Sequence, residues 1–444
     1  YHPSPAVVVR ALELFERSGR DDFLAIARRL LAHGDHEVRA AVLRAQTRAR
    51  PNRDTLEQAR ASTTAPVAAT ALVELAAHGW LEPQAALEQL ERLVEREPAV
   101  GRYIALAADG RPWPQLVPLL IRLIDAEDLD TRRQTVRALA AMAAPQAIPA
   151  LIQHLSDREV REEVRDTLVA MGEDAFRALE RALADFSLPE CVRVHVPRTI
   201  AGFRNQRAAN LLLRHLCSEP RGMVRYKILR GLGRLVTDDP RLQLDNQRLD
   251  ESIDRYLVHL LSFLHWTVTL ERGAAADPQR HSTGHELLLD LIRAKYVLAL
   301  ERLFRLIGLR YRGENVAQIY RGLISEDPTL RSTSRELLES LLPARIRDAT
   351  VALIDDLPEE ARLAAGESHY QPEPLEYEEL VQRLTKGSSR SVSYLASYHA
   401  AEIGLAGAGA LPVLSRDVLS GLPRPARRRP PATAALEPAL KGAA

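Results

Sequence analysis

Lysine and aromatic residues are scarce in this chain of 444 residues. The lysines are Lys227, Lys295, Lys386 and Lys441, so nearly all the positive charge is arginine. Aromatic residues make up 5% and hydrophobic residues 46%, proportions that exclude a core built on large rings. We expect a core of Leu, Ala, Val and Ile, as in stacked helices.

Cysteine is almost absent as well. Cys191 and Cys217 are the two cysteines, and neither lies in a CxxC or Cys/His pattern. This spacing argues against a zinc framework and a disulfide-stapled fold. We predict two buried free thiols in a reducing compartment.

The chain lacks a long hydrophobic run. The longest charge-free apolar stretch, residues 256–270, contains two histidines and is shorter than the roughly 20 residues that span a bilayer. We predict a buried helix there and a soluble, cytoplasmic protein. Because the sequence begins at Tyr1 without methionine, we expect a segment of a longer protein. A preceding region that tethers it to the cytoplasmic face of a membrane is an open alternative.

A strong excess of positive charge is also missing. The net charge is +1, and the stretch after Leu411 is itself basic, which leaves the rest slightly acidic. A domain that follows a phosphate backbone is usually clearly basic. Nucleic acid is therefore not the favoured partner, and we expect a protein.

What the chain does have is a residue pair that returns about every 31 positions. Spacing this regular is typical of one helical hairpin repeated, which predicts an all-α solenoid. The pairs are Val38-Arg39, Val67-Ala68, Val100-Gly101, Thr131-Arg132, Val160-Arg161, Val192-Arg193 and Val224-Arg225.

The clearest repeat covers residues 147–171. Ile148-Pro149 begins a first helix, because proline is tolerated in the first turn. A second helix begins near Glu159 and carries Val164 on its apolar face. Gly172 ends it with a left-handed conformation. Neither helix can bury its apolar face alone, so each hairpin needs its neighbours.

An aspartate recurs four residues before the arginine of several repeats. The aspartate suits a helix N-terminus, and the arginine can reach it or its equivalent in the next repeat. We interpret these residues as a structural ladder that sets the stacking register, and anion capture by the arginines is the alternative. The ladder is Asp35, Arg39, Asp128, Arg132, Asp157, Arg161, Arg193, Arg225, Asp327 and Arg331.

The period fails after Val236, and four regions follow from this. We predict a repeat array over 1–236, a linker and long helical hairpin over 237–310, further hairpins over 311–406 and a disordered Ala/Pro/Arg tail over 407–444. Thr283 to Glu286 resembles a capping box that begins the second long helix.

Residues that would carry chemistry are not recognisable. The chain has neither a G-x-x-x-x-G-K-[ST] loop nor a G-x-S-x-G elbow. His281 and His285 have the spacing of two metal ligands, but the expected cap places His281 before the helix. We predict no catalytic, cofactor-binding or metal-binding residue and no enzymatic activity. A helical-repeat enzyme or a nucleic-acid-binding module is the remaining alternative.

The D-x-x-V-R pattern over residues 1–236 resembles HEAT repeats, especially the short phycobilisome-lyase type. This resemblance implies a non-enzymatic scaffold for protein–protein interaction, or a regulatory arm. Residues 299–309, 319–323 and 331–342 resemble the soluble HEAT region of bacterial fusion proteins. In those proteins a major-facilitator domain similar to ATP/ADP transporters precedes the repeats. The alternative that follows is the cytoplasmic HEAT domain of such a protein, whose membrane domain would be a partner in the same polypeptide.

Overall fold

The computed structural model describes residues 4–18, 29–109, 111, 113–387 and 389–405. Every regular element within these ranges is a helix, so the predicted all-α class is confirmed. The chain forms two compact units, residues 1–204 and residues 205–444. The predicted repeat array, 1–236, therefore ends inside unit 2. The predicted disordered tail, 407–444, lies outside the described residues.

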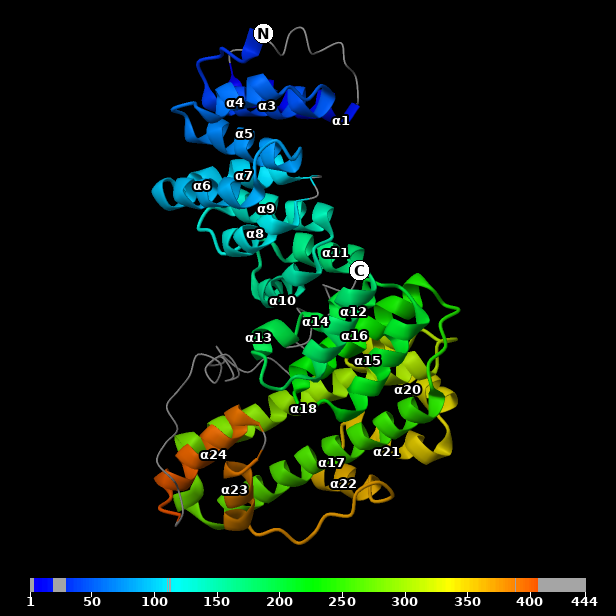
Figure 1. Cartoon of the computed structure of the whole chain (residues 1–444). Coiled ribbons are helices and arrows are strands. Elements are labelled where there is room, and N and C mark those ends of the chain that lie inside the picture. Colours follow the sequence, from blue (N-terminus) through cyan, green and yellow to red (C-terminus); the bar gives the residue numbers. More distant parts are fainter. Residues whose placement is uncertain (1–3, 19–28, 110, 112, 388, 406–444) are drawn as a thin grey trace. The chain divides into compact units, whose positions relative to one another are not determined.

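Unit 1 is a file of helical hairpins, drawn from blue to green in Figure 1. Its α-helices are α1 (Pro5–Ser18), α3 (His36–Ala49), α4 (Arg53–Arg60), α5 (Ala65–Ala77), α6 (Pro83–Arg96), α7 (Gly101–Ala108), α8 (Val117–Leu123), α9 (Leu129–Met142), α10 (Ile148–Gln153), α11 (Arg161–Ala170), α12 (Glu173–Ala184), α13 (Glu190–Arg193) and α14 (Val196–Ala201). The second helices of successive hairpins touch in order, from α3 through α5, α7, α9 and α11 to α14. This stacking is that of an α-solenoid.

The repeated pair explains the stacking, because its first member points into the core in all seven repeats. These residues are Val38, Val67, Val100, Thr131, Val160, Val192 and Val224, and all are buried. Where the arginine is lost, the second member is small. A Cβ atom on Gly101 would stand 2.7 Å from Leu123 Cδ2, so a larger residue there would have to displace the Leu123 side chain.

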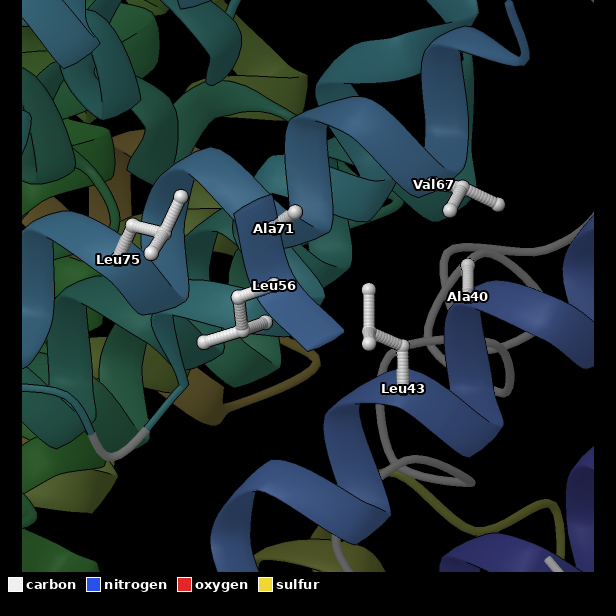
Figure 2. Packing of buried hydrophobic residues seen from close by; sticks show 6 residues of the cluster. All are labelled: Ala40, Leu43, Leu56, Val67, Ala71 and Leu75. Carbon is white, nitrogen blue, oxygen red and sulfur yellow. The ribbon is translucent and has the colours of Figure 1, made fainter. Parts of the chain in front are cut away.

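The hydrophobic core is shared between hairpins. Figure 2 shows Leu43 of α3 and Leu56 of α4 facing α5, and both are almost fully buried. Val67 and Leu75 of α5 belong to the same cluster. Each hairpin thus buries the apolar face of its neighbour. Burial of apolar surface stabilises the fold by about 25 cal/mol per Å².

The repeat around α10 and α11 has the predicted local features. Pro149 lies in the first turn of α10, and Leu151, Val164 and Leu168 are fully buried. Gly172 has a φ of +67° between α11 and α12, a conformation that glycine adopts at low cost. α11 begins at Arg161, two residues later than predicted, after a turn.

Unit 2 is built around two long helices. Its α-helices are α15 (Gln206–Ser218), α16 (Gly222–Asp238), α17 (Asn246–Ala276), α18 (Thr283–Arg310), α19 (Val316–Leu323), α20 (Pro328–Leu341), α21 (Ala344–Ile354), α22 (Glu359–Ala365), α23 (Tyr377–Thr385) and α24 (Arg390–Glu402). α17 and α18 lie side by side (Figure 1). The helices of the described ranges include none long and apolar enough to cross a membrane.

The start of α18 differs from the predicted capping box. Ser282, not Thr283, is the capping residue, and its side chain accepts a hydrogen bond from the His285 amide at 3.2 Å. His285 therefore stands three residues after the capping residue, where a capping box has Glu or Gln. Glu402 of α24, 118 residues away from Gly284, accepts instead from the Gly284 amide of this first turn at 2.9 Å.

The two cysteines are both free, as predicted, but neither is buried. Cys191 is exposed and Cys217 is half-buried. Cys191 lies on the short helix α13, whose neighbouring residues Val192 and Arg193 face the interior instead. One turn of helix cannot bury three successive side chains.

Candidate functional site

The ladder aspartates lie at helix starts. Asp35 accepts from the Glu37 amide at 2.7 Å and caps α3, while Asp128 and Asp327 cap α9 and α20. Hydrogen bonds from Thr131 hold the pKa of Asp128 below its usual range. Asp157 accepts from the Glu159 amide at 2.9 Å, in the turn that precedes α11.

Three ladder arginines share one contact that differs from the predicted ion pair. Each guanidinium donates to the two backbone carbonyls five and six residues earlier, where the preceding helix ends. The bonds run from Arg39 to His33 and Gly34 (2.7 and 2.9 Å), from Arg161 to Leu155 and Ser156 (2.7 and 2.6 Å), and from Arg331 to Ser325 and Glu326 (2.8 and 3.0 Å). These carbonyls would otherwise lack partners, so the arginines tie the two helices of a hairpin together.

The other ladder arginines differ from one another. Arg132 forms ion pairs with Asp157 and Glu159 of the next hairpin, the geometry that the ladder predicts. Arg193 is buried and donates to the Leu183 carbonyl at 2.7 Å. Arg225 lies over the ring of Tyr256. That the ladder sets the stacking register stays a prediction.

A hollow of about 620 Å³ opens beside α9, α11 and α14, the second helices of three successive hairpins. We call it the arginine hollow. Five arginines and four acids line it: Arg133, Arg158, Arg161, Arg165, Arg198, Glu159, Glu162, Glu163 and Asp166.

Arg165 is a buried and loosely paired charge of the arginine hollow. Its side chain is 9% exposed, and its Nε atom has no hydrogen-bond partner among the described residues. Burial lowers the pKa of Arg165 to about 10, and the charges of Arg198 and Arg161 add to this effect. The guanidinium stays charged at neutral pH but at an energetic cost, which a bound anion would reduce.

The acids of the hollow hold these arginines loosely. Glu162 is 76% exposed and lies 3.9 Å from Arg165 and 3.5 Å from Arg198. Arg133 and Glu163 are 3.4 Å apart. Charge-assisted hydrogen bonds are usually about 2.7–2.9 Å long. A better-placed carboxylate can therefore displace Glu162 at little cost.

His281 and His285, which have the spacing of two metal ligands, belong to unit 2. His285 is buried and shares a hydrogen-bonded cluster with Ser282, Tyr377, His399 and Glu402. We call it the His399 cluster. The Tyr377 hydroxyl lies 3.1 Å from His285 Nδ1 and 2.6 Å from His399 Nε2. Burial lowers the pKa of His285, and it lowers the pKa of His399 to about 4.

The His399 cluster stabilises unit 2 and holds no metal-ligand set. Within the described ranges, no group of three or more His, Cys, Asp or Glu side chains is arranged to hold a metal ion. Tyr377 stands between the two imidazoles and hydrogen-bonds both. The cluster links α18 to α23 and α24.

The sequence prediction missed most of the arginine hollow. Of its arginines, Arg161 is in the predicted ladder, whereas Arg133, Arg158, Arg165 and Arg198 are not. One signal was present: Arg161 and Arg165 are one turn apart on α11, and like charges at that spacing repel. The contribution of Arg198 depends on how the next hairpin stacks.

Comparison with known proteins assigns part of this solenoid to a repeat class. Residues 84–172 and 116–190 match the family model for HEAT repeats. This segment, which includes α9, α11 and most of the arginine hollow, therefore consists of HEAT repeats. The phycobilisome-lyase type and the transporter fusion remain predictions.

Two solved structures are similar to the chain, but both have low TM-scores. Both are crystal structures of engineered proteins, from the Northeast Structural Genomics Consortium. The first is 15% identical, with 87% of this chain and 99% of that protein covered and a TM-score of 0.25. The second is 18% identical, with 49% and 98% covered and a TM-score of 0.20. A comparison with curated proteins finds no match.

Proposed function

We propose that this protein is a non-enzymatic scaffold that binds an acidic segment of a partner protein in the arginine hollow. The observation that carries the proposal is Arg165, which is buried, charged and only loosely paired on a surface shared by three successive hairpins. A solenoid displays such a surface along its stacked helices.

Charge complementarity supports an acidic segment as the partner. Arginine clusters recognise acidic motifs through paired N–H donors. A carboxylate of the partner would replace the exposed Glu162 between Arg165 and Arg198. The remaining acids of the hollow, among them Glu159 and Asp166, would repel a second negative charge placed beside them. We therefore expect a segment with isolated acidic side chains.

Fluorescence anisotropy tests this proposal with a labelled Glu-containing peptide of roughly ten residues. A Lys-containing peptide of equal length serves as the comparison. The protein should bind the acidic peptide, and Arg198→Glu should weaken binding by about tenfold or more. Arg137→Glu is the matched control, because Arg137 is an exposed arginine of α9 that does not line the hollow.

Salt gives a second measurement. Binding should weaken as the ionic strength rises, because exposed charges are screened over about 8 Å at 0.15 M. Equal affinity of both peptides, or equal loss in Arg198→Glu and Arg137→Glu, would contradict the proposal. The cytoplasmic location and a tether before Tyr1 stay predictions that the upstream gene sequence tests.

A further inference from the structure

A small polar cavity lies in unit 2. Its volume is about 60 Å³, and Arg225, Arg255, Tyr256 and His259 line its polar side. These residues belong to α16 and α17. A volume of this size holds a few water molecules or one small ion.

Polar atoms at and beside this cavity have no hydrogen-bond partner within the described part of the chain. The Tyr256 hydroxyl and Arg225 Nε belong to residues that line it, and Arg302 Nε belongs to a neighbouring residue whose charge acts on Tyr256 and Arg225. Tyr256 is 6% exposed, and a buried group left unpaired usually has a partner that the protein chain does not supply. The guanidinium of Arg225 lies 5.6 Å from the centre of the Tyr256 ring.

The cavity also carries uncompensated positive charge. The ion pairs of the described residues include none with Arg225 or Arg302, and Glu301, the neighbour of Arg302, pairs with Arg305 at 2.8 Å. Burial and then the charges of Arg225, Arg302 and Lys295 lower the pKa of His259 to about 4. Water would satisfy the unpaired donors but would leave the charges of Arg225 and Arg302 unopposed.

Helix α16 adds to the positive field. Its N-terminus begins at Gly222, and its capping residue Arg221 makes no side-chain cap. A Cβ atom on Gly222 would stand 3.0 Å from Arg302 Nη1, so this guanidinium rests at the positive end of the helix dipole. Cations are disfavoured there and anions are favoured. Glu219, two residues before Arg221, is buried and accepts from the Arg221 amide at 2.8 Å.

We propose that this cavity binds a small tetrahedral oxyanion, held by Arg225, Arg302 and the Tyr256 hydroxyl. The donors come from three helices, α16, α17 and α18, so they approach from different directions. A tetrahedral oxyanion offers acceptor oxygens in several directions, whereas a planar carboxylate offers two in one plane. Arginine suits such oxygens because its N–H donors form a fixed fork. The same chemistry fits free phosphate or the phosphate group of a larger molecule.

Isothermal titration calorimetry of the full chain tests this proposal with inorganic phosphate, O-phosphoserine and acetate at equal ionic strength. Phosphate should bind more tightly than acetate. Arg302→Gln and Tyr256→Phe should each weaken phosphate binding, by about tenfold or more for the arginine. Arg234→Gln should leave it unchanged, because Arg234 is an exposed arginine of α16 outside the cavity.

The two phosphate probes identify the source of the ion. Binding of both indicates a phosphate group carried by a larger molecule, and binding of phosphate alone indicates the free ion. Arg225→Gln provides an independent variant if Arg302→Gln does not fold. Phosphate binding no tighter than acetate binding would overturn the proposal. So would unchanged phosphate affinity in Arg225→Gln and Tyr256→Phe.

Discussion

The two units hold their helices together over different distances along the chain. In the described part of unit 1, most ion pairs between hairpins join residues about one repeat apart, such as Arg132 with Asp157 and Arg122 with Glu91. In unit 2, Arg280 pairs with Glu378 and Ser282 bonds Glu402, 98 and 120 residues apart. Nearest-neighbour stacking lets hairpins open separately, whereas long-range closure makes many helices depend on one another. We therefore expect stepwise unfolding of unit 1 and concerted unfolding of unit 2.

The largest expected effect is that of Leu151→Ala in unit 1. Leu151 is fully buried in α10, so the truncation leaves a cavity and should cost about 2–5 kcal/mol. Hydrogen exchange should accelerate in α10 and its neighbours and stay unchanged in α17 and α18. Leu14→Ala, at a leucine that is 57% exposed, is the control. Faster exchange in α17 would contradict the independence of the two units.

Acidification should affect unit 2 more than unit 1. Among the described histidines, burial lowers the pKa of five in unit 2 and of one, His78, in unit 1. The five are His259, His265, His285, His369 and His399. The unfolded chain takes up protons more readily at these sites, so stability is complete above pH 6.5 and is lost as the pH falls towards 4. His399 alone should cost about 2 kcal/mol between pH 6.5 and 5.

Urea unfolding followed by hydrogen exchange at pH 7 and pH 5 measures this difference. His399→Gln should reduce the pH dependence of unit 2 and leave that of unit 1 as it is. An identical pH dependence in the wild type and the variant would show that His399 does not titrate as described.

Two helical glycines of unit 2 distinguish the effect of close packing on stability from the effect of helix propensity. A Cβ atom on Gly284 would stand 2.4 Å from Glu402 Oε2 and 3.0 Å from the His399 Cα atom. Gly284→Ala should therefore push α24 away from α18 and cost roughly 1–3 kcal/mol. Gly233 of α16 has nothing within 4 Å, so Gly233→Ala should stabilise by about 0.5–1 kcal/mol. Thermal denaturation should move the two variants in opposite directions.

The smallest expected destabilisation is shared by both units. Arg161→Ala in unit 1 and Arg331→Ala in unit 2 each remove two bonds to helix-end carbonyls. Each should cost about 1–2 kcal/mol, more than an exposed ion pair. Arg137→Ala, at an exposed arginine of α9, should change stability little. Chemical denaturation of the three variants checks this, and a cost for Arg137→Ala equal to the others would argue against the carbonyl contact.

The repeat could be predicted because it depends on short-range periodicity. The spacing of the residue pairs located the second helices, and Val38 and Val160 are buried as the pattern requires. Burial of one face repeats with the helix period, and a single sequence displays that period directly. The same period marks the apolar faces of the long helices α17 and α18.

The polar contacts were harder to predict, because most of them depend on how separate segments meet. Glu402 completes the cap of α18 from the far end of the described chain, and spacing does not indicate such a partner. The role of the ladder arginines at helix-end carbonyls was missed because an aspartate one turn away suggested an ion pair. The arginine hollow required Arg198, which reaches it through the stacking of α14 on α11.

The placement of the two cysteines has a practical consequence. Cys191 belongs to unit 1 and Cys217 to unit 2, and both thiols are free and not fully buried. The natural chain thus offers one attachment point for a spin label or fluorophore on each unit, with no engineered cysteine required. Distances measured between these labels, with and without an acidic peptide, would report directly how this ligand changes the separation of the two units.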